Sequence, residues 1–97
     1  MDATSNALSG LRAASTQLGN VANNIANANT PGFKQQDVNQ STDANGGVET
    51  QLSGTNQDVD VDQQLVKADI ATYNFKANLT VLKKQDEMTQ SLLDIKA

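Results

Sequence analysis

The chain has 97 residues, of which 37% are hydrophobic and only 3% aromatic, and it carries a net charge of −4. This length leaves room for one small domain, and with so few large apolar side chains we expect a thin core that is marginally stable in a monomer. Cysteine and histidine are both absent from the sequence, which excludes disulfides, thiol nucleophiles, imidazole bases and most zinc sites.

The same composition argues against several classes of function. No apolar run reaches the roughly 20 residues that a membrane-spanning helix needs. The acidic balance and the lack of a basic cluster disfavour nucleic-acid binding. Without histidine, cysteine or a phosphate-binding glycine loop, there is no group on which to build catalysis. We therefore predict that the chain is not an enzyme and that it takes no cofactor, metal or small-molecule substrate.

Residues 3–29 carry the seven-residue apolar repeat of a coiled coil. The repeat has a series of mostly small residues and a series of larger ones: Ala7, Ala14, Val21 and Ala28, with Leu11, Leu18 and Ile25 between them. Gly10 and Gly19 each lower helix propensity by up to ~1 kcal/mol relative to alanine, which indicates a helix that neighbours stabilise. The pair Pro31 and Gly32 suits the centre of a type II turn. The pattern predicts a long helix that ends at this turn.

Residues 35–60 form a polar segment with acidic residues and no basic residue: Asp37, Asp43, Glu49, Asp58 and Asp60. The run 43–47 is a strong turn signal, and Val48, Thr50 and Leu52 alternate with polar residues behind it. A short β-hairpin and a mobile loop both fit this pattern, because the strands of such a hairpin would be only weakly apolar.

A second helix is predicted over residues 61–95. Asp60, with Gln63 three residues further on, makes a capping box at its start. The apolar stripe begins on one line and then drifts to another: Val61, Leu65, Ala68, Phe75, Leu79 and Leu82, then Ile70, Ala77, Val81, Met88, Leu92 and Ile95. A stripe that drifts around a helix indicates more than one packing partner along its length.

The aspartates at the start of this helix have an alternative interpretation. Asp58, Asp60 and Asp62, with Asp69 further along, resemble part of an EF-hand calcium loop. However, Gln63 stands where the loop needs its sharp-turn glycine, and no glutamate ends the loop. Helix capping therefore explains these aspartates better than calcium binding.

Together these elements predict an all-α protein, in which two long antiparallel helices are joined by a polar loop with room for a short β-hairpin. One domain is expected, in three segments: residues 1–34 with the first helix and its turn, residues 35–60 with the acidic loop, and residues 61–97 with the second helix. The seam between the two helices is assigned to apolar residues from both: Leu11, Leu18, Ile25, Phe75, Leu79 and Leu82.

The run 22–34 reads Ala-Asn-Asn-Ile-Ala-Asn-Ala-Asn-Thr-Pro-Gly-Phe-Lys. Asparagine is a mediocre helix former because its amide competes for the local backbone, so a cluster of asparagines indicates a surface that a partner recognises. This ordered run resembles the N-terminal signature of the bacterial flagellar axial proteins, the family of rod, hook and hook-junction subunits. Within that family it is most similar to the short basal-body rod proteins.

The C-terminal half adds to the resemblance, with four short elements in the order and spacing of rod and hook proteins: Val59-Asp60-Val61-Asp62, Phe75-Lys76-Ala77-Asn78, Asp86-Glu87-Met88 and Leu92-Leu93. The chain departs from the family pattern in two ways. Tyr73 stands where the family commonly has an arginine, and the central segment is too short for the β-rich outer domain of hook and distal-rod proteins. What remains resembles the inner coiled-coil domain alone.

The resemblance implies a structural subunit of the flagellar basal-body rod, in the periplasm, that assembles with itself and with other axial subunits through its terminal helices. Its first residues lack a basic region followed by an apolar region, so we expect no cleaved signal. The resemblance implies the route, which is export in an unfolded state by the flagellar type III apparatus. Contacts between subunits are assigned to five residues: Asn23, Asn24, Asn27, Phe33 and Asn78.

Two other interpretations remain open at this point. The stronger is a soluble regulatory or chaperone-like helical hairpin that binds rod or export components without joining the axis. The weaker is an unrelated four-helix homodimer. Oligomeric behaviour separates them, since an axial subunit should polymerise on concentration and a regulator should keep a fixed small size.

Overall fold

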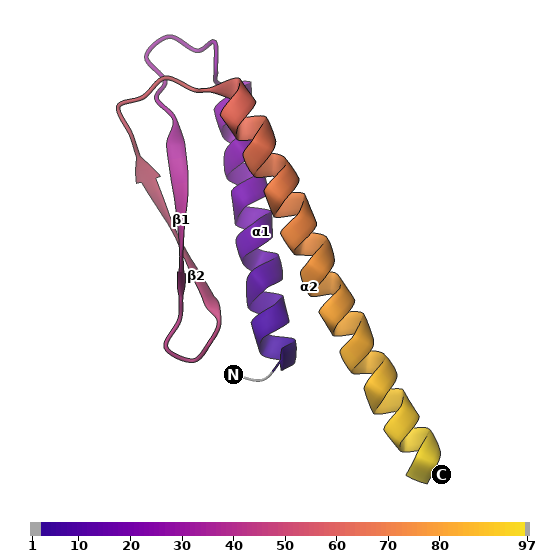
Figure 1. Cartoon of the computed structure of the whole chain (residues 1–97). Helices are drawn as coiled ribbons and strands as arrows, with labels where there is room; N and C mark the ends of the chain where they lie inside the picture. Colours follow the sequence, from indigo (N-terminus) through magenta and orange to yellow (C-terminus); the bar gives the residue numbers. More distant parts are fainter. Residues whose placement is uncertain (1–2, 97) are drawn as a thin grey trace.

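The computed structural model describes residues 3–96 and contains two helices and two strands. In chain order they are α1 (Ala3–Ala26), β1 (Gln36–Thr42), β2 (Val48–Gly54) and α2 (Val61–Lys96). The two helices run antiparallel, and α1 lies between α2 on one side and the two-stranded sheet on the other (Figure 1). Within the described residues, no helix is long and apolar enough to cross a membrane.

The all-α prediction is wrong, because the polar middle segment forms an antiparallel β-hairpin. β1 pairs with β2 from Gln36 opposite Gly54 to Thr42 opposite Val48. The strands are closed by a turn in which Asp43 N–H donates to the Gly47 carbonyl at 2.7 Å, with Gly46 at a φ of +93°. An isolated hairpin of two polar strands is marginal in water. Side chains of α1 hold this hairpin in place. The sequence of residues 35–60 does not indicate these contacts, because the side chains belong to another part of the chain.

The first helix ends at Ala26, three residues before the predicted end. A turn follows, in which Phe33 N–H donates to the Thr30 carbonyl at 3.2 Å and Gly32 has a φ of +79°. A positive φ at the third position of a four-residue turn is the type II geometry, as the pair Pro31 and Gly32 predicts. The turn redirects the chain from α1 into β1.

The second helix begins where the capping motif predicts. The Asp60 side chain accepts a hydrogen bond from Gln63 N–H at 3.1 Å, and the Asp60 carbonyl accepts one from Gln64 N–H at 3.0 Å. This is the bonding of an N-cap, in which a carboxylate satisfies a free N–H of the first turn. The finding supports helix capping over the calcium-loop interpretation of the aspartates in this region.

The core between the helices is made of small side chains. The buried apolar residues of the described chain are four alanines and one valine: Ala7, Ala13, Ala14, Val21 and Ala71. Gly10 of α1 lies so close to α2 that a Cβ placed on it would be 2.5 Å from the Asn78 amide nitrogen. Small residues at the contact let the two backbones approach closely.

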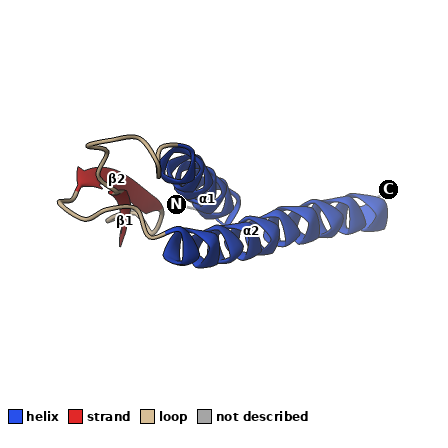
Figure 2. Cartoon of the chain, turned by 90° about the horizontal axis from the view of Figure 1, so that it is seen from above, coloured by secondary structure: helices blue, strands red, loops and turns tan. Residues whose placement is uncertain are grey.

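The second helix is much longer than the first, with 36 residues against 24. Since Gly10 lies against Asn78 and the helices are antiparallel, the last part of α2 extends past the start of α1 and has no neighbour among residues 3–96 (Figure 1). Seen from above, this end of α2 points away from the hairpin (Figure 2). The described chain is therefore elongated, with extents of 64 × 25 × 14 Å.

Candidate functional site

The hairpin is attached to α1 by side-chain hydrogen bonds to backbone groups of the strands. The Asn24 side-chain amide bonds both backbone polar groups of Gln36. Its nitrogen donates to the Gln36 carbonyl at 2.8 Å, and its oxygen accepts from the Gln36 backbone N–H at 3.0 Å. Asn20 donates to the same carbonyl at 2.8 Å. At the far end of α1, the Ser9 hydroxyl donates to the Val48 carbonyl at 2.9 Å and accepts from Val48 N–H at 2.6 Å.

A buried amide cluster joins the three elements at the end of the molecule where α2 begins. Asn24 and Gln64 are completely buried, and the Asn24 nitrogen donates to the Gln64 side-chain oxygen at 3.0 Å. The buried Gln35 side chain accepts from Asp60 N–H at 3.1 Å and donates to Gln63 at 3.2 Å. Buried amides without hydrogen bonds would cost free energy, so this cluster fixes the hairpin, α1 and α2 in one arrangement.

The residues assigned to contacts between subunits lie in different environments. Asn24 makes its hydrogen bonds within the chain, and Asn78 is half-buried against Gly10. Asn23 is exposed, while Asn27 is half-buried and donates to the Asn23 carbonyl at 2.9 Å. Phe33 is half-buried beside the turn. Contacts between subunits remain a prediction for all five residues.

The six residues assigned to the helical seam are only partly covered. Leu11, Leu18, Ile25 and Leu82 are half-buried, while Phe75 and Leu79 are 37% and 38% exposed. The alanine series of the heptad repeat is instead more deeply buried, at Ala7 and Ala14. The series of larger side chains therefore has exposed surface that a further partner could cover. The assignment of these residues to the seam between the helices is still a prediction.

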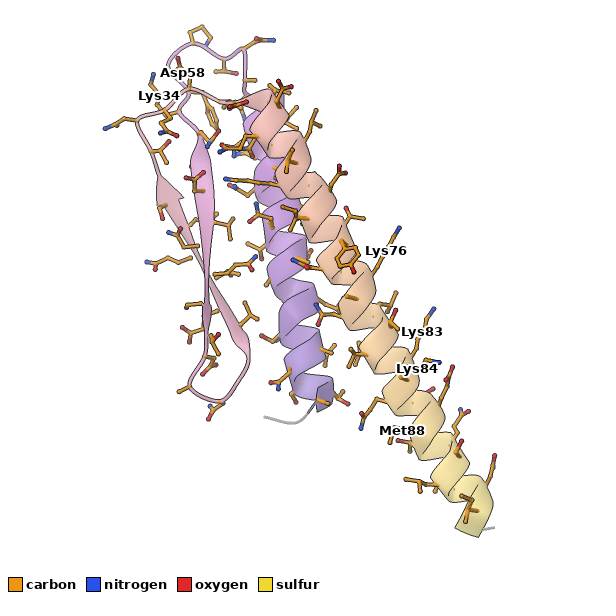
Figure 3. The ribbon with its side chains drawn as sticks, viewed as in Figure 1. Lys34, Asp58, Lys76, Lys83, Lys84 and Met88 are labelled. Carbon is orange, nitrogen blue, oxygen red and sulfur yellow. The ribbon has the colours of Figure 1, made fainter. Side chains whose placement is uncertain are left out.

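Most of the large apolar side chains on α2 are exposed, so this helix carries the candidate assembly surface. The most exposed of them lie between residues 65 and 95: Leu65, Val66, Ile70, Tyr73, Met88, Leu92, Leu93 and Ile95. The lysines Lys76, Lys83 and Lys84 project away from α1, and Met88 lies on the part of α2 that extends past it (Figure 3). Apolar side chains without a neighbour mark a surface that is covered in an assembled state.

One ion pair joins the two ends of the segment that contains the hairpin. The Lys34 ammonium lies 2.7 Å from an Asp58 carboxylate oxygen, and both side chains are exposed (Figure 3). The hydrogen bond from Lys34, and then its positive charge, lower the pKa of Asp58 below its ordinary value. A second pair, Lys67 and Asp37 at 3.4 Å, connects α2 to β1.

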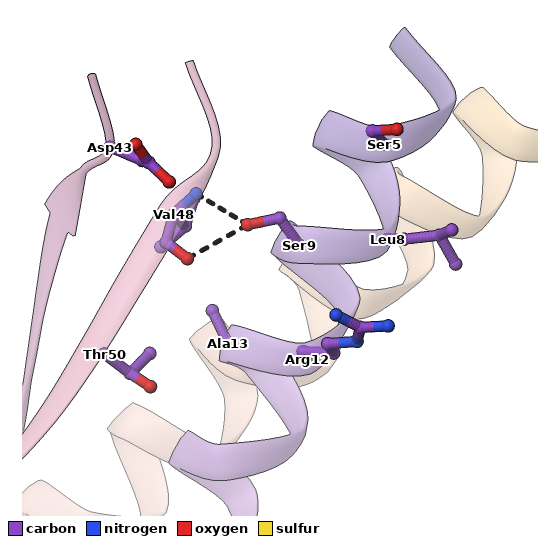
Figure 4. Close-up of a pocket in the computed structure, with 8 residues that line it drawn as sticks. All are labelled: Ser5, Leu8, Ser9, Arg12, Ala13, Asp43, Val48 and Thr50. Carbon is purple, nitrogen blue, oxygen red and sulfur yellow. Dashed lines mark hydrogen bonds between the residues drawn. The ribbon is translucent and has the colours of Figure 1, made fainter. Parts of the chain in front are cut away.

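Several hollows flank the hairpin, and two of them lie against the helices as follows. One, of about 470 Å³, is lined only by α1, Asp43 of the turn, and β2, with Leu8, Arg12 and Thr50 on its walls (Figure 4). The other, of about 290 Å³, lies between α1, β1 and α2 and is lined by Val38 and Ile70 among others. Among the described residues, no group of three or more His, Cys, Asp or Glu side chains could hold a metal ion. Neither hollow brings together an acid, a base and a nucleophile in the manner of a catalytic site.

The sequence analysis did not predict which residues attach the hairpin to α1. Asn20 and Asn24 are four positions apart and so lie on one face of the helix, and this spacing could have indicated that both amides bond the same carbonyl group. Ser9, Gln35 and Gln64 gave no signal, because each bonds a group that lies far away along the chain.

Comparison with known families gives a match at the N-terminal end of the chain. Residues 5–34 match the family model described as flagella basal body rod protein. The matched segment consists of nearly all of α1 and the turn that follows it, and it confirms the resemblance to the flagellar rod family. The family has a structural role in the flagellar basal body, which supports a non-enzymatic function. No curated protein matches the sequence significantly.

Proposed function

From this family match, we propose that the chain is a structural subunit of the flagellar basal-body rod, exported unfolded without a cleaved signal and assembled through its two terminal helices. The observation that carries the proposal is the combination of the rod signature on α1 with an α2 on which most of the large apolar side chains are exposed within the described residues. Its partners are other rod and axial subunits, further copies of itself and the export apparatus. Its location is the periplasmic part of the basal body.

The energetics of the single chain support assembly. No leucine, isoleucine, phenylalanine or methionine of the described residues is fully buried, so the interior gains little of the roughly 1.5–3 kcal/mol that burial of each such side chain provides. Leu92 and Ile95 are 59% and 80% exposed. Packing these side chains against neighbouring helices would offset the entropy lost when the helices become ordered.

The same weakness supports export in an unfolded state. Much of the interior consists of amide hydrogen bonds, whose net contribution to stability is about 0.5–1.5 kcal/mol each. A chain with such an interior unfolds at a low cost in free energy, and it recovers stability on assembly. The exposed Asn23 and the half-buried Phe33 are then available to contact neighbouring subunits near the turn.

The test is to purify hook–basal bodies from the native organism and to measure this chain by quantitative mass spectrometry. We expect recovery at a fixed ratio to the other rod subunits, in amounts that survive washing in high salt. Absence from intact basal bodies, with the protein abundant in the cytoplasm, would contradict the proposal and favour a regulatory hairpin that binds rod or export components.

A further inference from the structure

The turn that closes the hairpin contains a chemically reactive pair of residues, Asn45 and Gly46. Asparagine is one of the thermally labile residues of proteins. The backbone nitrogen of the following residue lies close enough to attack the carbonyl carbon of the asparagine side chain. This attack is easiest when the following residue is glycine, which has no side chain to obstruct it and is conformationally free. Asn45 is the only asparagine in the sequence that is followed by glycine.

The side chain of Asn45 is accessible and unrestrained. Asn45 is exposed, and its side-chain amide forms no hydrogen bond with another residue between 3 and 96. Its backbone N–H is bonded, to the Asp43 carboxylate at 3.1 Å. Asn24, in contrast, is buried with its amide fully engaged. Asn56 is as exposed as Asn45, but the residue that follows it is glutamine.

The closed turn holds the attacking nitrogen away from this side chain. Gly46 N–H donates to the Asp43 carbonyl at 2.9 Å, which closes a four-residue turn. Asn45 does not have a positive φ, so the turn is of type I with Asn45 in its third position. Gly46 follows with a φ of +93°, a combination that is common in short hairpin loops. Attack therefore requires that the bond from Gly46 to Asp43 breaks and that Asn45 rotates.

Opening of the turn does not require the rest of the chain to unfold. Next to the turn, the Ser9 hydroxyl bonds both backbone groups of Val48 (Figure 4). The buried amide cluster around Asn24 and Gln36 holds the opposite end of the hairpin. Segments with exposed hydrogen bonds and few buried apolar contacts open locally at a low cost in free energy. The turn is such a segment, and the end at Gln36 is not.

We propose that Asn45 is a site of spontaneous deamidation, and that opening of this turn controls its rate. In the open turn the Gly46 nitrogen loses its proton to a base of the solvent and attacks the side-chain carbonyl carbon of Asn45. The bond from this carbon to the side-chain nitrogen breaks, and ammonia leaves with a proton from water. The product is a cyclic succinimide that joins the two residues.

Water then opens the ring at either of its two carbonyl carbons. If the bond from the side-chain carbon to the Gly46 nitrogen breaks, residue 45 becomes aspartate. If the bond from the main-chain carbon breaks, residue 45 becomes isoaspartate, and the backbone then runs through its side chain. In total the reaction consumes water and releases ammonia, and it needs no oxidant, reductant or enzyme.

The isoaspartate product weakens one end of the hairpin. It lengthens the backbone inside the turn by a carbon atom, so the bonds of Asp43 with Gly46 and Gly47 no longer fit together. It also adds a carboxylate beside that of Asp43, and like charges at this distance repel. We therefore expect Val48 to separate from Ser9, while Asn24 continues to hold Gln36.

The modification goes beyond the proposed axial role and does not rest on it. Deamidation is a property of the free folded chain in solution, whereas the axial role is tested on purified basal bodies. A chain that deamidates at Asn45 need not be a rod subunit, and a rod subunit need not deamidate there. The two proposals therefore fail separately.

The first experiment incubates the full chain near neutral pH, digests it, and separates the aspartate and isoaspartate peptides by chromatography with mass spectrometry. We expect Asn45 to deamidate before every other asparagine and to give both products, at a rate that rises with pH. Asn56 is the internal control and should stay intact over the same period. In the variant Asn45→Gln the reaction should be lost, because the longer side chain needs a larger ring. Equal reaction at Asn56, or aspartate without isoaspartate, would overturn the proposal.

The second experiment tests whether the turn controls the rate. Ser9→Ala removes the hydroxyl that bonds Val48, so the turn should open more often and Asn45 should deamidate about fivefold faster. Thr89→Ala removes a hydroxyl that bonds the Gln85 carbonyl in the last part of α2, and it should leave the rate unchanged. The parent chain should react more slowly when folded than in urea. Equal rates in the parent and in Ser9→Ala, or in folded and unfolded parent, would refute control by the turn.

Amide hydrogen exchange of the isoaspartate form, measured by NMR, tests the structural consequence. We expect the Val48 N–H to lose its protection, because its bond to Ser9 is broken. The Gln36 N–H should keep its protection, because Asn24 still bonds it. Loss of protection at both residues, or at neither, would contradict the release of one end of the hairpin.

Discussion

Asn24 acts as a strand partner although it lies on a helix. Its amide presents an acceptor and a donor to the N–H and carbonyl of Gln36, which is the pairing that a neighbouring strand would supply. The same nitrogen donates to Gln64 at the start of α2. One buried amide therefore connects α1, β1 and α2. Its removal would leave Gln36 N–H and the Gln64 side-chain oxygen without this partner, while the Gln36 carbonyl would keep its bond from Asn20.

The variant Asn24→Ala tests this role. We expect the free energy of unfolding to fall by about 1–3 kcal/mol, because buried polar groups of Gln36 and Gln64 lose their hydrogen bonds. Urea denaturation followed by circular dichroism measures the change. The control is Asn23→Ala, an exposed neighbour on the same helix, which should stay within about 0.5 kcal/mol of the parent. Equal effects of the two variants would show that the buried amide is not a strand partner.

The Lys34–Asp58 pair contributes to the stability of the fold, and the direction in which this contribution changes with pH is known. The pKa of Asp58 is lowered in the folded chain by the hydrogen bond and the charge of Lys34. A depressed carboxyl pKa contributes stability above the unfolded-state pKa, and that contribution is lost as the pH falls through the folded-state pKa. We expect Lys34→Met to raise the Asp58 pKa toward its ordinary value in a carboxyl NMR titration. Lys84→Met, which breaks a distant pair with Glu87, should leave the Asp58 titration unchanged.

At the scale of elements, the approach of α1 to α2 is set by glycine and alanine. A Cβ on Gly10 would meet the Asn78 side chain at 2.5 Å, whereas a Cβ on Gly19 would meet nothing within 4 Å. Both glycines lie inside α1, so both carry the same penalty in helix propensity. Only Gly10 has a packing reason to be glycine, since a side chain there would push the two helices apart.

This pair of glycines gives a matched prediction. Gly19→Ala should raise the free energy of unfolding by up to about 1 kcal/mol, since alanine is the better helix former. Gly10→Ala should lower the free energy of unfolding or leave it unchanged, because the Asn78 amide must move away. Thermal denaturation of both variants measures the difference. The double variant Gly10→Ala, Asn78→Ala should show the same rise in the free energy of unfolding as Gly19→Ala. If it does not, the Asn78 side chain is not what opposes a side chain at position 10.

How far the sequence predicts the elements depends on where their stabilising contacts lie. The two helices follow from local signals, the heptad repeat of α1 and the Asp60 cap of α2, and their ends fall within three residues of the prediction. The hairpin does not follow from local signals, because its strands are polar and are bonded by Ser9, Asn20 and Asn24 of α1. The candidate assembly surface was predicted only in outline, as an apolar stripe that drifts around α2. The two helices differ in length, and this difference decides which apolar residues of α2 stay exposed.

At the scale of the whole molecule, only one face of α2 is covered, and only along its first part. There Ala71 and Gln64 are buried against small side chains and amides, while Leu65 and Tyr73 on other faces stay more than half exposed. The last part of α2 carries Met88, Leu92, Leu93 and Ile95, all more than half exposed. Substitutions in this part should therefore affect assembly without affecting the fold of the single chain.

The variant Leu92→Glu tests this separation. We expect the free energy of unfolding of the dilute chain to change by less than about 0.5 kcal/mol, because Leu92 is 59% exposed and beyond the end of α1. Assembly into basal bodies, measured by motility of a complemented deletion strain and by mass spectrometry, should be lost, since a charge buried between helices is costly. Gln90→Glu is the matched control, because it adds the same charge about 200° around the helix and should assemble normally. Normal motility of Leu92→Glu would mean that the end of α2 stays exposed in the rod. Equal loss in both variants would mean that the added charge, and not the buried apolar face, prevents assembly.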